Sequence, residues 1–187
     1  MLTTRICAAV LAVALAGCAH QPDAATPAAG SGDRLAKLHD AAECLRQHGI
    51  SNFADPVLGA NGQVFTDLRG LENPNLAEST VDAALEACRD PLGAANWNPN
   101  ELPPAPAALV EAGVRAAACM RAHGLPNYKD PTANSVYTPG HGFGMSPDDL
   151  PPGADKTTPA VHEAMTACRS ILDAEIAASR LDQLAGK

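Results

Sequence analysis

One stretch of this chain occurs twice, and the duplication limits what the chain can fold into. Residues 41–56 read AAECLRQHGISNFADP, and residues 116–131 read AAACMRAHGLPNYKDP. From the cysteine onward, seven of the thirteen positions are identical, and a shorter Ala-Cys-Arg repeat follows at 87–89 and at 167–169. Because a repeated sequence encodes a repeated structural unit, we expect two copies of one fold.

Helical periodicity surrounds a long loop in each copy. Apolar residues recur at intervals of three and four over residues 34–48 and 107–123, and again in the segments that start near 79 and at 158, the last of which extends to 181. The sequence therefore predicts a mainly α fold, built from two pseudo-repeated helix–long loop–helix units.

Glycines and short apolar pairs indicate how the helices end and what the loops contain. Gly49 and Gly124 follow the first helix of each unit, where a left-handed residue commonly ends a helix. In the first loop an Asn-Gly pair lies between two short apolar segments, which is a strong hairpin signal. The second loop carries a shortened version before Val136-Tyr137. We therefore expect small β-ribbons in both loops.

The cysteines of the repeat favour a disulfide in each unit. Four cysteines allow three pairings. The duplication favours Cys44–Cys88 and Cys119–Cys168, because each unit then carries its own cross-link. Aromatic residues make up only 3% of the chain, so small units of this composition need covalent support. Each bridge would stabilise its unit by roughly 4 kcal/mol in the chain-entropy model.

The first eighteen residues predict the compartment. Arg5 precedes an apolar run at 6–15 that has the length of the hydrophobic region of a signal peptide and is too short to span a bilayer. The LAGC segment at 15–18 resembles a bacterial lipobox, which implies cleavage before Cys18 and lipidation of its thiol. The predicted organisation is a lipoprotein signal peptide (1–17), a flexible tether (18–33), a first repeat unit (34–90), a linker (91–106) and a second repeat unit (107–187). The single tryptophan, Trp97, falls in the linker, where we expect it to cover the seam between the units.

The repeat also raises a metal hypothesis. Cys-x-x-x-His on a helix places both side chains on one face, and the pattern occurs in both units. Together the four residues offer a set of ligands suited to Zn²⁺ or Cu(I): Cys44, His48, Cys119 and His123. In the competing interpretation the cysteines form disulfides and the histidines cap helix ends. A second group of soft ligands occurs in the second unit alone, around a glycine-rich loop whose spacing predicts no geometry: His141, Met145, His162 and Met165.

An arginine and an aspartate recur at the same spacing. Arg46 and Asp55 are nine residues apart, as are Arg121 and Asp130. A guanidinium in the last helical turn can bind the carboxylate of an Asp-Pro turn, so we expect a structural ion pair in each unit. The aromatic residue two positions before each aspartate is expected to anchor the loop.

The duplicated motif resembles that of a known family. The segment CMRAHGLPNYKDP at 119–131, with the later Ser146-Pro147 turn and Ala167-Cys168, is similar to a motif of small actinobacterial lipoproteins and secreted proteins. Those proteins usually carry Phe-Pro-Asp-Pro where this chain has YKDP and FADP. The resemblance covers residues 34–90 and 107–173 and implies an actinobacterial source. It implies no activity, substrate or site residue.

Charge and motif content narrow the function. The net charge of −8 argues against nucleic acid as a partner, since phosphate binding needs a basic surface. The sequence contains no Gly-x-Ser-x-Gly elbow, no His-Glu-x-x-His and no phosphate loop. We therefore expect a non-enzymatic binding or interaction module without a cofactor. Its N-terminal lipid would anchor it on the extracytoplasmic face of a bacterial membrane, in the cell envelope, and its ligand would be a protein or a small molecule. The alternative is an extracytoplasmic Cu or Zn protein that uses the Cys and His residues of the repeats.

Overall fold

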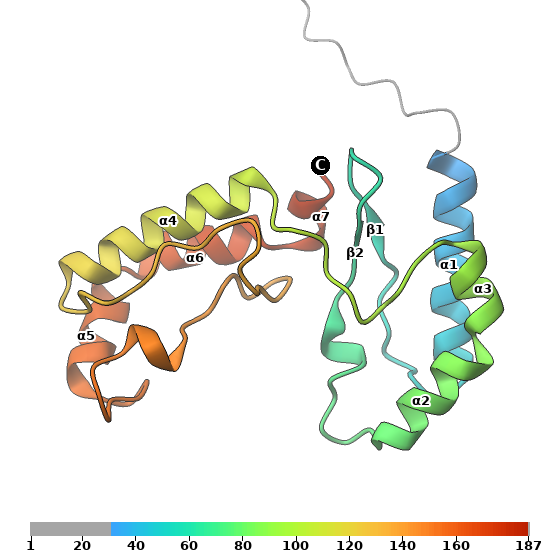
Figure 1. Cartoon of the computed structure of the whole chain (residues 1–187), viewed down its shortest axis with the longest axis horizontal. Helices are drawn as coiled ribbons and strands as arrows, with labels where there is room; N and C mark the ends of the chain where they lie inside the picture. The colour runs from blue at the N-terminus through green and yellow to red at the C-terminus, as the bar shows by residue number, and fades with distance from the viewer. Residues whose placement is uncertain (1–30, 187) are drawn as a thin grey trace, which may run out of the picture.

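Two helical units lie beside each other, and a β-ribbon stands between them (Figure 1). The computed structural model describes residues 31–186. Its mainly helical architecture, with a disulfide joining two helices in each unit, confirms the predicted fold class. Among the helices of this range none is both long and apolar enough to cross a bilayer. The predicted signal peptide and the lipidation site Cys18 lie outside the described residues.

In the described residues both units share a first helix, a 3₁₀ turn and two later helices, whereas the strands belong to the first unit and an extra short helix belongs to the second. The first contains α1 (Ser31–Gln47), β1 (Val57–Leu58), β2 (Val64–Phe65), a 3₁₀ turn (Leu68–Gly70), α2 (Glu78–Ala87) and α3 (Arg89–Ala94). The second contains α4 (Ala107–Ala122), a 3₁₀ turn (Pro147–Asp149), α5 (Pro159–Ala167), α6 (Arg169–Ala178) and α7 (Leu181–Leu184). Helix α1 begins at Ser31, so the last three residues of the predicted tether belong to the first helix.

The repeat glycines end the first helix of each unit as predicted. Gly49 has a φ of 106° and Gly124 a φ of 99°. In both units the next amide donates to the carbonyl five residues earlier, from Ile50 to Leu45 and from Leu125 to Met120, at 3.1 Å. These contacts satisfy carbonyls that the helix end would leave unpaired.

The second helix of each unit is interrupted at its cysteine, where the sequence predicts a continuous helix. Cys88 has φ −98° and ψ 14°, and Cys168 has φ −95° and ψ 6°. Pro91 could explain the interruption in the first unit, but Ile171 occupies the matching place in the second. The interruption therefore accompanies the disulfide-bonded cysteine. One consequence is that residues 91–94, predicted as linker, belong to α3.

The β-ribbon of the first unit is confirmed, and the second ribbon is not. Val57 pairs with Phe65 and Leu58 with Val64, around a turn in which Gly62 has a φ of 74°. In the second unit, within the described residues, one isolated bridge joins Thr138 to Gly142. The predicted strand residue Tyr137 instead inserts its ring into the core and donates its hydroxyl to the Pro103 carbonyl at 3.1 Å.

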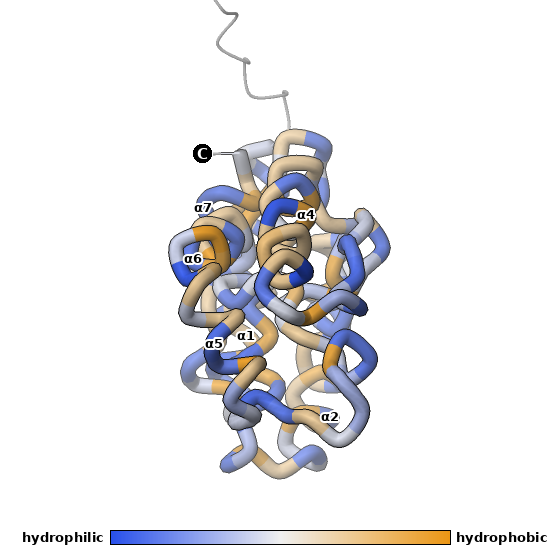
Figure 2. The backbone as a smooth tube through the Cα atoms, turned by 90° about the vertical axis from the view of Figure 1, so that its left-hand side faces the viewer, coloured by the Kyte–Doolittle hydropathy of each residue, from blue (hydrophilic) through white to orange (hydrophobic). Residues whose placement is uncertain are grey.

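Three apolar clusters hold the described part of the chain together. One lies inside each unit, and a third, which we call the joint cluster, connects them. The joint cluster is formed by Phe65, Ala105, Leu109, Tyr137 and Leu184. Figure 2 shows hydrophobic and hydrophilic residues alternating along α4 and α6, as expected for helices with one buried face.

The tryptophan does not occupy the seam. Trp97 is 8% exposed and belongs to the core of the first unit, where its ring centroid lies 5.9 Å from that of Phe53. The predicted position between the units is therefore wrong, because the linker folds back over its own unit before it reaches α4.

A close approach at Gly113 gives a testable packing prediction. A Cβ atom on Gly113 would lie 2.6 Å from the Cγ atom of Pro131 and 2.7 Å from ring atoms of Phe143. Gly113→Ala is expected to lower the free energy of unfolding by about 1–3 kcal/mol, as overpacked cores do. Gly93→Ala is the matched control, since that helical position has no atom within 4 Å of the new Cβ. The control should gain roughly 0.5–1 kcal/mol. Urea denaturation measures both, and equal effects would contradict the packing argument.

Candidate functional site

The repeated arginine and aspartate form the predicted ion pair in both units. Arg46 Nη1 donates to Asp55 Oδ1 at 2.8 Å, and Arg121 Nη1 donates to Asp130 Oδ1 at 2.8 Å. The same Nη1 atoms donate to the backbone carbonyls of Phe53 and Tyr128, the two buried loop anchors, at 2.9 and 2.8 Å. This geometry ties the start of each long loop to its helix.

The aspartate of the first unit is held in its charged form. Partial burial acts to raise the pKa of the Asp55 carboxyl, but hydrogen bonds from Arg46 and from His39 outweigh it and keep that pKa below its ordinary value. The Asp55 carboxylate already accepts from two side chains. Its contacts are those of a structural group.

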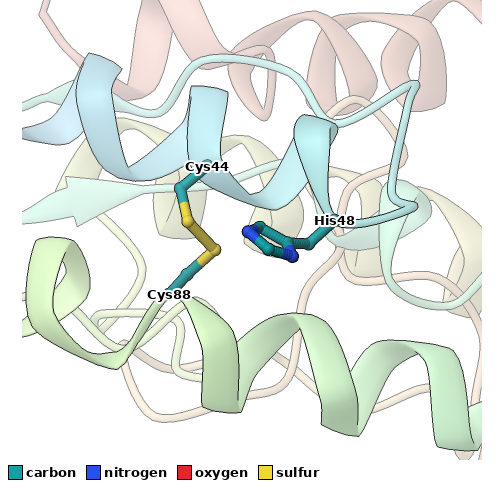
Figure 3. Close-up of side chains that lie close together, drawn as sticks. All are labelled: Cys44, His48 and Cys88. Carbon is teal, nitrogen blue, oxygen red and sulfur yellow. A yellow bond between two sulfur atoms is a disulfide. The ribbon is translucent and has the colours of Figure 1, made fainter.

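The disulfides confirm the predicted pairing, and each has a histidine beside it. Cys44 pairs with Cys88 and Cys119 with Cys168, with Cα atoms 5.8 and 5.9 Å apart. His48 lies next to the first bridge (Figure 3), and ligand atoms of Cys44, His48 and Cys88 lie within 4.8 Å of one another. His123 stands in the same relation to the second bridge.

The structure therefore divides the hypothetical four-ligand metal site between two units. Cys44 and His48 belong to one cluster, and Cys119 and His123 to another. In each cluster the second cysteine is the disulfide partner from the later helix. All four sulfur atoms are engaged in bridges.

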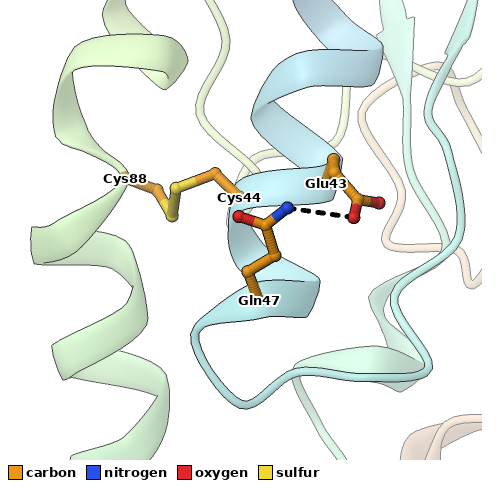
Figure 4. The surroundings of a disulfide bond; sticks show 4 residues. All are labelled: Glu43, Cys44, Gln47 and Cys88. Carbon is orange, nitrogen blue, oxygen red and sulfur yellow. Dashed lines mark hydrogen bonds between the residues drawn. A yellow bond between two sulfur atoms is a disulfide. The ribbon is translucent and has the colours of Figure 1, made fainter.

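A polar pair beside the first bridge is absent from the second. Gln47 Nε2 donates to Glu43 Oε1 at 3.1 Å next to the Cys44–Cys88 bridge (Figure 4). The matching positions of the second unit are Ala118 and Ala122. The Glu43–Gln47 pair is therefore a surface feature of the first unit and is not among the contacts that both units share.

A cavity lies in the second unit. Its volume is about 460 Å³, which is within the range of small-molecule sites. The apolar part of its lining is formed mainly by Met145, Met165, Leu172 and Ile176. Charged and titratable side chains complete it: His141, Lys156, His162, Arg169, Asp173 and Glu175. The four soft ligands singled out in the sequence thus line one cavity, although their spacing predicted no geometry.

The glycine-rich loop is a fixed wall of this cavity. Phe143 N–H donates to Glu175 Oε1 at 2.7 Å, and Gly142 N–H donates to Ser179 Oγ at 2.9 Å. Tyr128 closes the wall by donating its hydroxyl to the Gly144 carbonyl at 2.8 Å, and burial raises the pKa of that phenol to about 12. Gly142 has a φ of 73°, a left-handed conformation that other residues rarely adopt, and a Cβ there would also meet the carboxyl group of the buried Glu175, so this position requires glycine.

Glu175 is a buried acid in this wall. The residue is 5% exposed, and burial raises the pKa of its carboxyl above the ordinary value despite the hydrogen bond from Phe143. The folded protein therefore binds this proton more tightly than the unfolded chain does. Proton binding and stability are linked, so the protonated Glu175 favours the folded state. This contribution to the free energy of unfolding is complete below the unfolded-state pKa and is lost as the pH rises through the folded-state pKa.

Replacing Glu175 by glutamine tests the direction of this pH dependence. Glu175→Gln keeps an oxygen that can accept from Phe143 N–H but cannot ionise. The variant is expected to match the wild type near pH ~4 and to be more stable near pH ~7. Thermal unfolding across that range measures the difference. The exposed Glu163→Gln is the control and should show no such divergence. A Glu175→Gln curve parallel to the wild type would refute the burial argument.

Sequence reasoning did not find several residues of this cavity. Lys156, Asp173 and Glu175 carry no motif, and Arg169 belongs to the Ala-Cys-Arg repeat, which gives no sign of a cavity. The convergence of these residues depends on how the loop folds onto α6. Comparison of the chain with protein-family models, with curated proteins and with solved structures finds no match. The resemblance of the repeat to small actinobacterial lipoproteins stays a prediction.

Proposed function

We propose that this protein is a lipid-anchored binding module of the bacterial cell envelope, with the cavity of the second unit as its ligand site. The observation that carries the proposal is an open cavity of about 460 Å³ with a half-exposed apolar lining. Exposed apolar surface in a concavity is typical of ligand sites. The lipobox-like segment and the two disulfides support an oxidising location outside the cytoplasm.

The difference between the two units supports a binding role for the second. Helix α3 has 6 residues and α6 has 10, so α6 extends past the matching end of α3. Glu175 and Ile176, which line the cavity, lie on that extension. The cavity is thus built partly from residues on a helical extension that has no counterpart in the first unit, whereas the arginine–aspartate ion pair and the disulfide occur in both units.

Binding can be tested with a neutral hydrophobic dye. Every described core cluster and both bridges lie within residues 31–186, so a chain starting at residue 19 keeps all of them. Nile red is expected to bind this chain, and Ile176→Glu to weaken binding about tenfold or more by charging the apolar wall. Leu35→Glu is the matched control: Leu35 is 43% exposed and Ile176 is 39% exposed. Equal losses in the two variants would reject the cavity as the site.

The anchor has its own test. The mature protein extracted in detergent is expected to begin at Cys18 and to carry lipid on that thiol. Peptide mass spectrometry of the N-terminal fragment measures both. A fragment that begins upstream of Cys18, or that carries an unmodified Cys18, would contradict the anchoring proposal.

A second candidate function is metal binding by the two cysteine–histidine clusters. Their ligand atoms lie within 4.8 Å of one another in both units, which is the observation in its favour. Cysteine binds Zn²⁺ or Cu(I) as a thiolate, so these clusters would need open bridges. Thiol counting without reductant, together with metal analysis of the purified protein, separates the candidates. Four reactive thiols and bound metal would favour this function over the first.

A further inference from the structure

The charged side chains around the cavity indicate more about the class of its ligand than the volume does. Of the thirteen Lys and Arg residues, Arg5 and Lys187 lie outside the described range, which leaves eleven. Seven of these eleven form ion pairs with carboxylates. Arg34 donates to the Gly62 carbonyl. Three cations remain that make no side-chain hydrogen bond or ion pair within residues 31–186: Arg115, Lys156 and Arg169.

Two of these three unpaired cations line the same cavity. Lys156 and Arg169 belong to its lining, and Arg115 does not. In a chain of net charge −8 most cations have acidic neighbours, so two unpaired cations at one apolar cavity suggest a partner that the chain does not itself supply. His141 and His162 line the same cavity and can add hydrogen bonds.

The acids of the cavity do not occupy these cations. Glu175 is buried and accepts from the Phe143 amide, and it makes no ion pair within residues 31–186. Asp173 is exposed and is the one carboxylate of the lining that could compete for an arriving anion. Asp173 forms no ion pair with Lys156 or Arg169 within residues 31–186.

The apolar wall determines the rest of the ligand. Met145, Met165 and Leu172 are half-buried against the core of the second unit, and Ile176 is 39% exposed. The two thioether side chains are flexible and adapt to different apolar shapes. A ligand that satisfies both parts of the site has an apolar chain and one anionic group.

We propose that the cavity binds a single-chain amphiphile with an anionic head, its chain against Met145, Met165, Leu172 and Ile176 and its head at Lys156 and Arg169. This inference rests on the proposed binding function and names its ligand class. A carboxylate and a phosphate head share the chemistry, because both accept charge-assisted hydrogen bonds from guanidinium and ammonium groups.

Four probes with the same alkyl chain test the head group. Undecanoate, decyl phosphate, decanol and decyltrimethylammonium are titrated calorimetrically into the chain that starts at residue 19. At least one anion is expected to bind about tenfold or more tightly than decanol, and the cation more weakly than decanol. The tighter of the two anions identifies the head as carboxylate or phosphate. The anionic preference should shrink at high salt, which screens exposed charges.

Variants assign the preference to the two cations. Lys156→Gln combined with Arg169→Gln should bring the anions to within about twofold of decanol. Both positions are exposed, so the fold should persist. Arg115→Gln removes the third unpaired cation, away from the cavity, and should leave the preference intact.

The outcomes distinguish a failure of the proposed ligand class from a failure of the proposed binding function. If the wild type binds decanol and both anions equally, and Ile176→Glu weakens all of them, the binding function stands and the anionic head is wrong. If no probe binds the wild type, both proposals are wrong. Equal loss of the preference in Arg115→Gln and in the double variant would also overturn the assignment of the head to Lys156 and Arg169.

Discussion

Removing either disulfide is expected to lower the free energy of unfolding by about 4 kcal/mol. The bridges span 44 and 49 residues, and closing loops of this length removes that much entropy from the unfolded chain in the chain-entropy model. Domains of this kind have total stabilities of about 5–15 kcal/mol, so the loss is a large share. Denaturant unfolding of Cys44→Ala/Cys88→Ala and of Cys119→Ala/Cys168→Ala measures it.

The two bridges serve as controls for each other. Because the entropy term depends on the logarithm of loop length, the model predicts losses that differ by only roughly 0.1 kcal/mol. Cys88 and Cys168 are both fully buried, so the side-chain volume removed is also alike. Reduced wild-type protein should unfold at a denaturant concentration below that of either variant, since it lacks both bridges. A loss under about 1 kcal/mol in both variants would mean that packing alone holds the units.

The repeat made much of the architecture predictable. Cys44, Gly49 and Asp55 have counterparts at the same spacing in the second copy. A prediction about the helix end or about the ion pair of the loop therefore applies to both units. The arginine–aspartate ion pairs, the helix ends at glycine and the disulfide pairing all depend on contacts within some fifty residues of one unit. Such contacts can be predicted from residues of one unit, and the same contacts are expected in its copy.

The cavity was not predictable by the same means. One wall of the cavity forms where the loop around Gly142 packs against α6. This packing depends on a long-range hydrogen bond between Phe143 and Glu175. The sequence marks Gly140–Gly144 as unusual but does not say what the loop lies against. Likewise Trp97 was assigned to the seam because it lies in the linker, whereas the linker returns to the first unit's core before crossing.

The joint cluster leads to the second large effect. Phe65 is 1% exposed, and its ring packs in the joint cluster with Leu109 of α4 and Leu184 of α7, so it connects the ribbon of the first unit to the second unit. Phe65→Ala is expected to cost about 3–5 kcal/mol, as large-to-small core substitutions at phenylalanine do. It should also separate the unfolding of the two units, because the apolar contact between them is largely removed.

Two probes can detect that separation in one denaturation experiment. Trp97 is the only tryptophan and lies in the core of the first unit, so its fluorescence reports that unit, whereas far-ultraviolet circular dichroism reports helices of both. In the wild type the two curves should coincide, as a single cooperative transition requires. In Phe65→Ala they should diverge.

The control for Phe65→Ala changes a core residue that does not touch the second unit. Ile50 is 2% exposed and belongs to the core of the first unit alone. Ile50→Ala should lower stability by about 2–5 kcal/mol and leave the fluorescence and dichroism curves coincident, because the joint cluster remains. Leu109→Ala, fully buried in the joint cluster from the α4 side, should instead reproduce the divergence seen in Phe65→Ala. If Phe65→Ala and Leu109→Ala both unfold in one coincident transition, the units are coupled by the linker and not by this apolar contact.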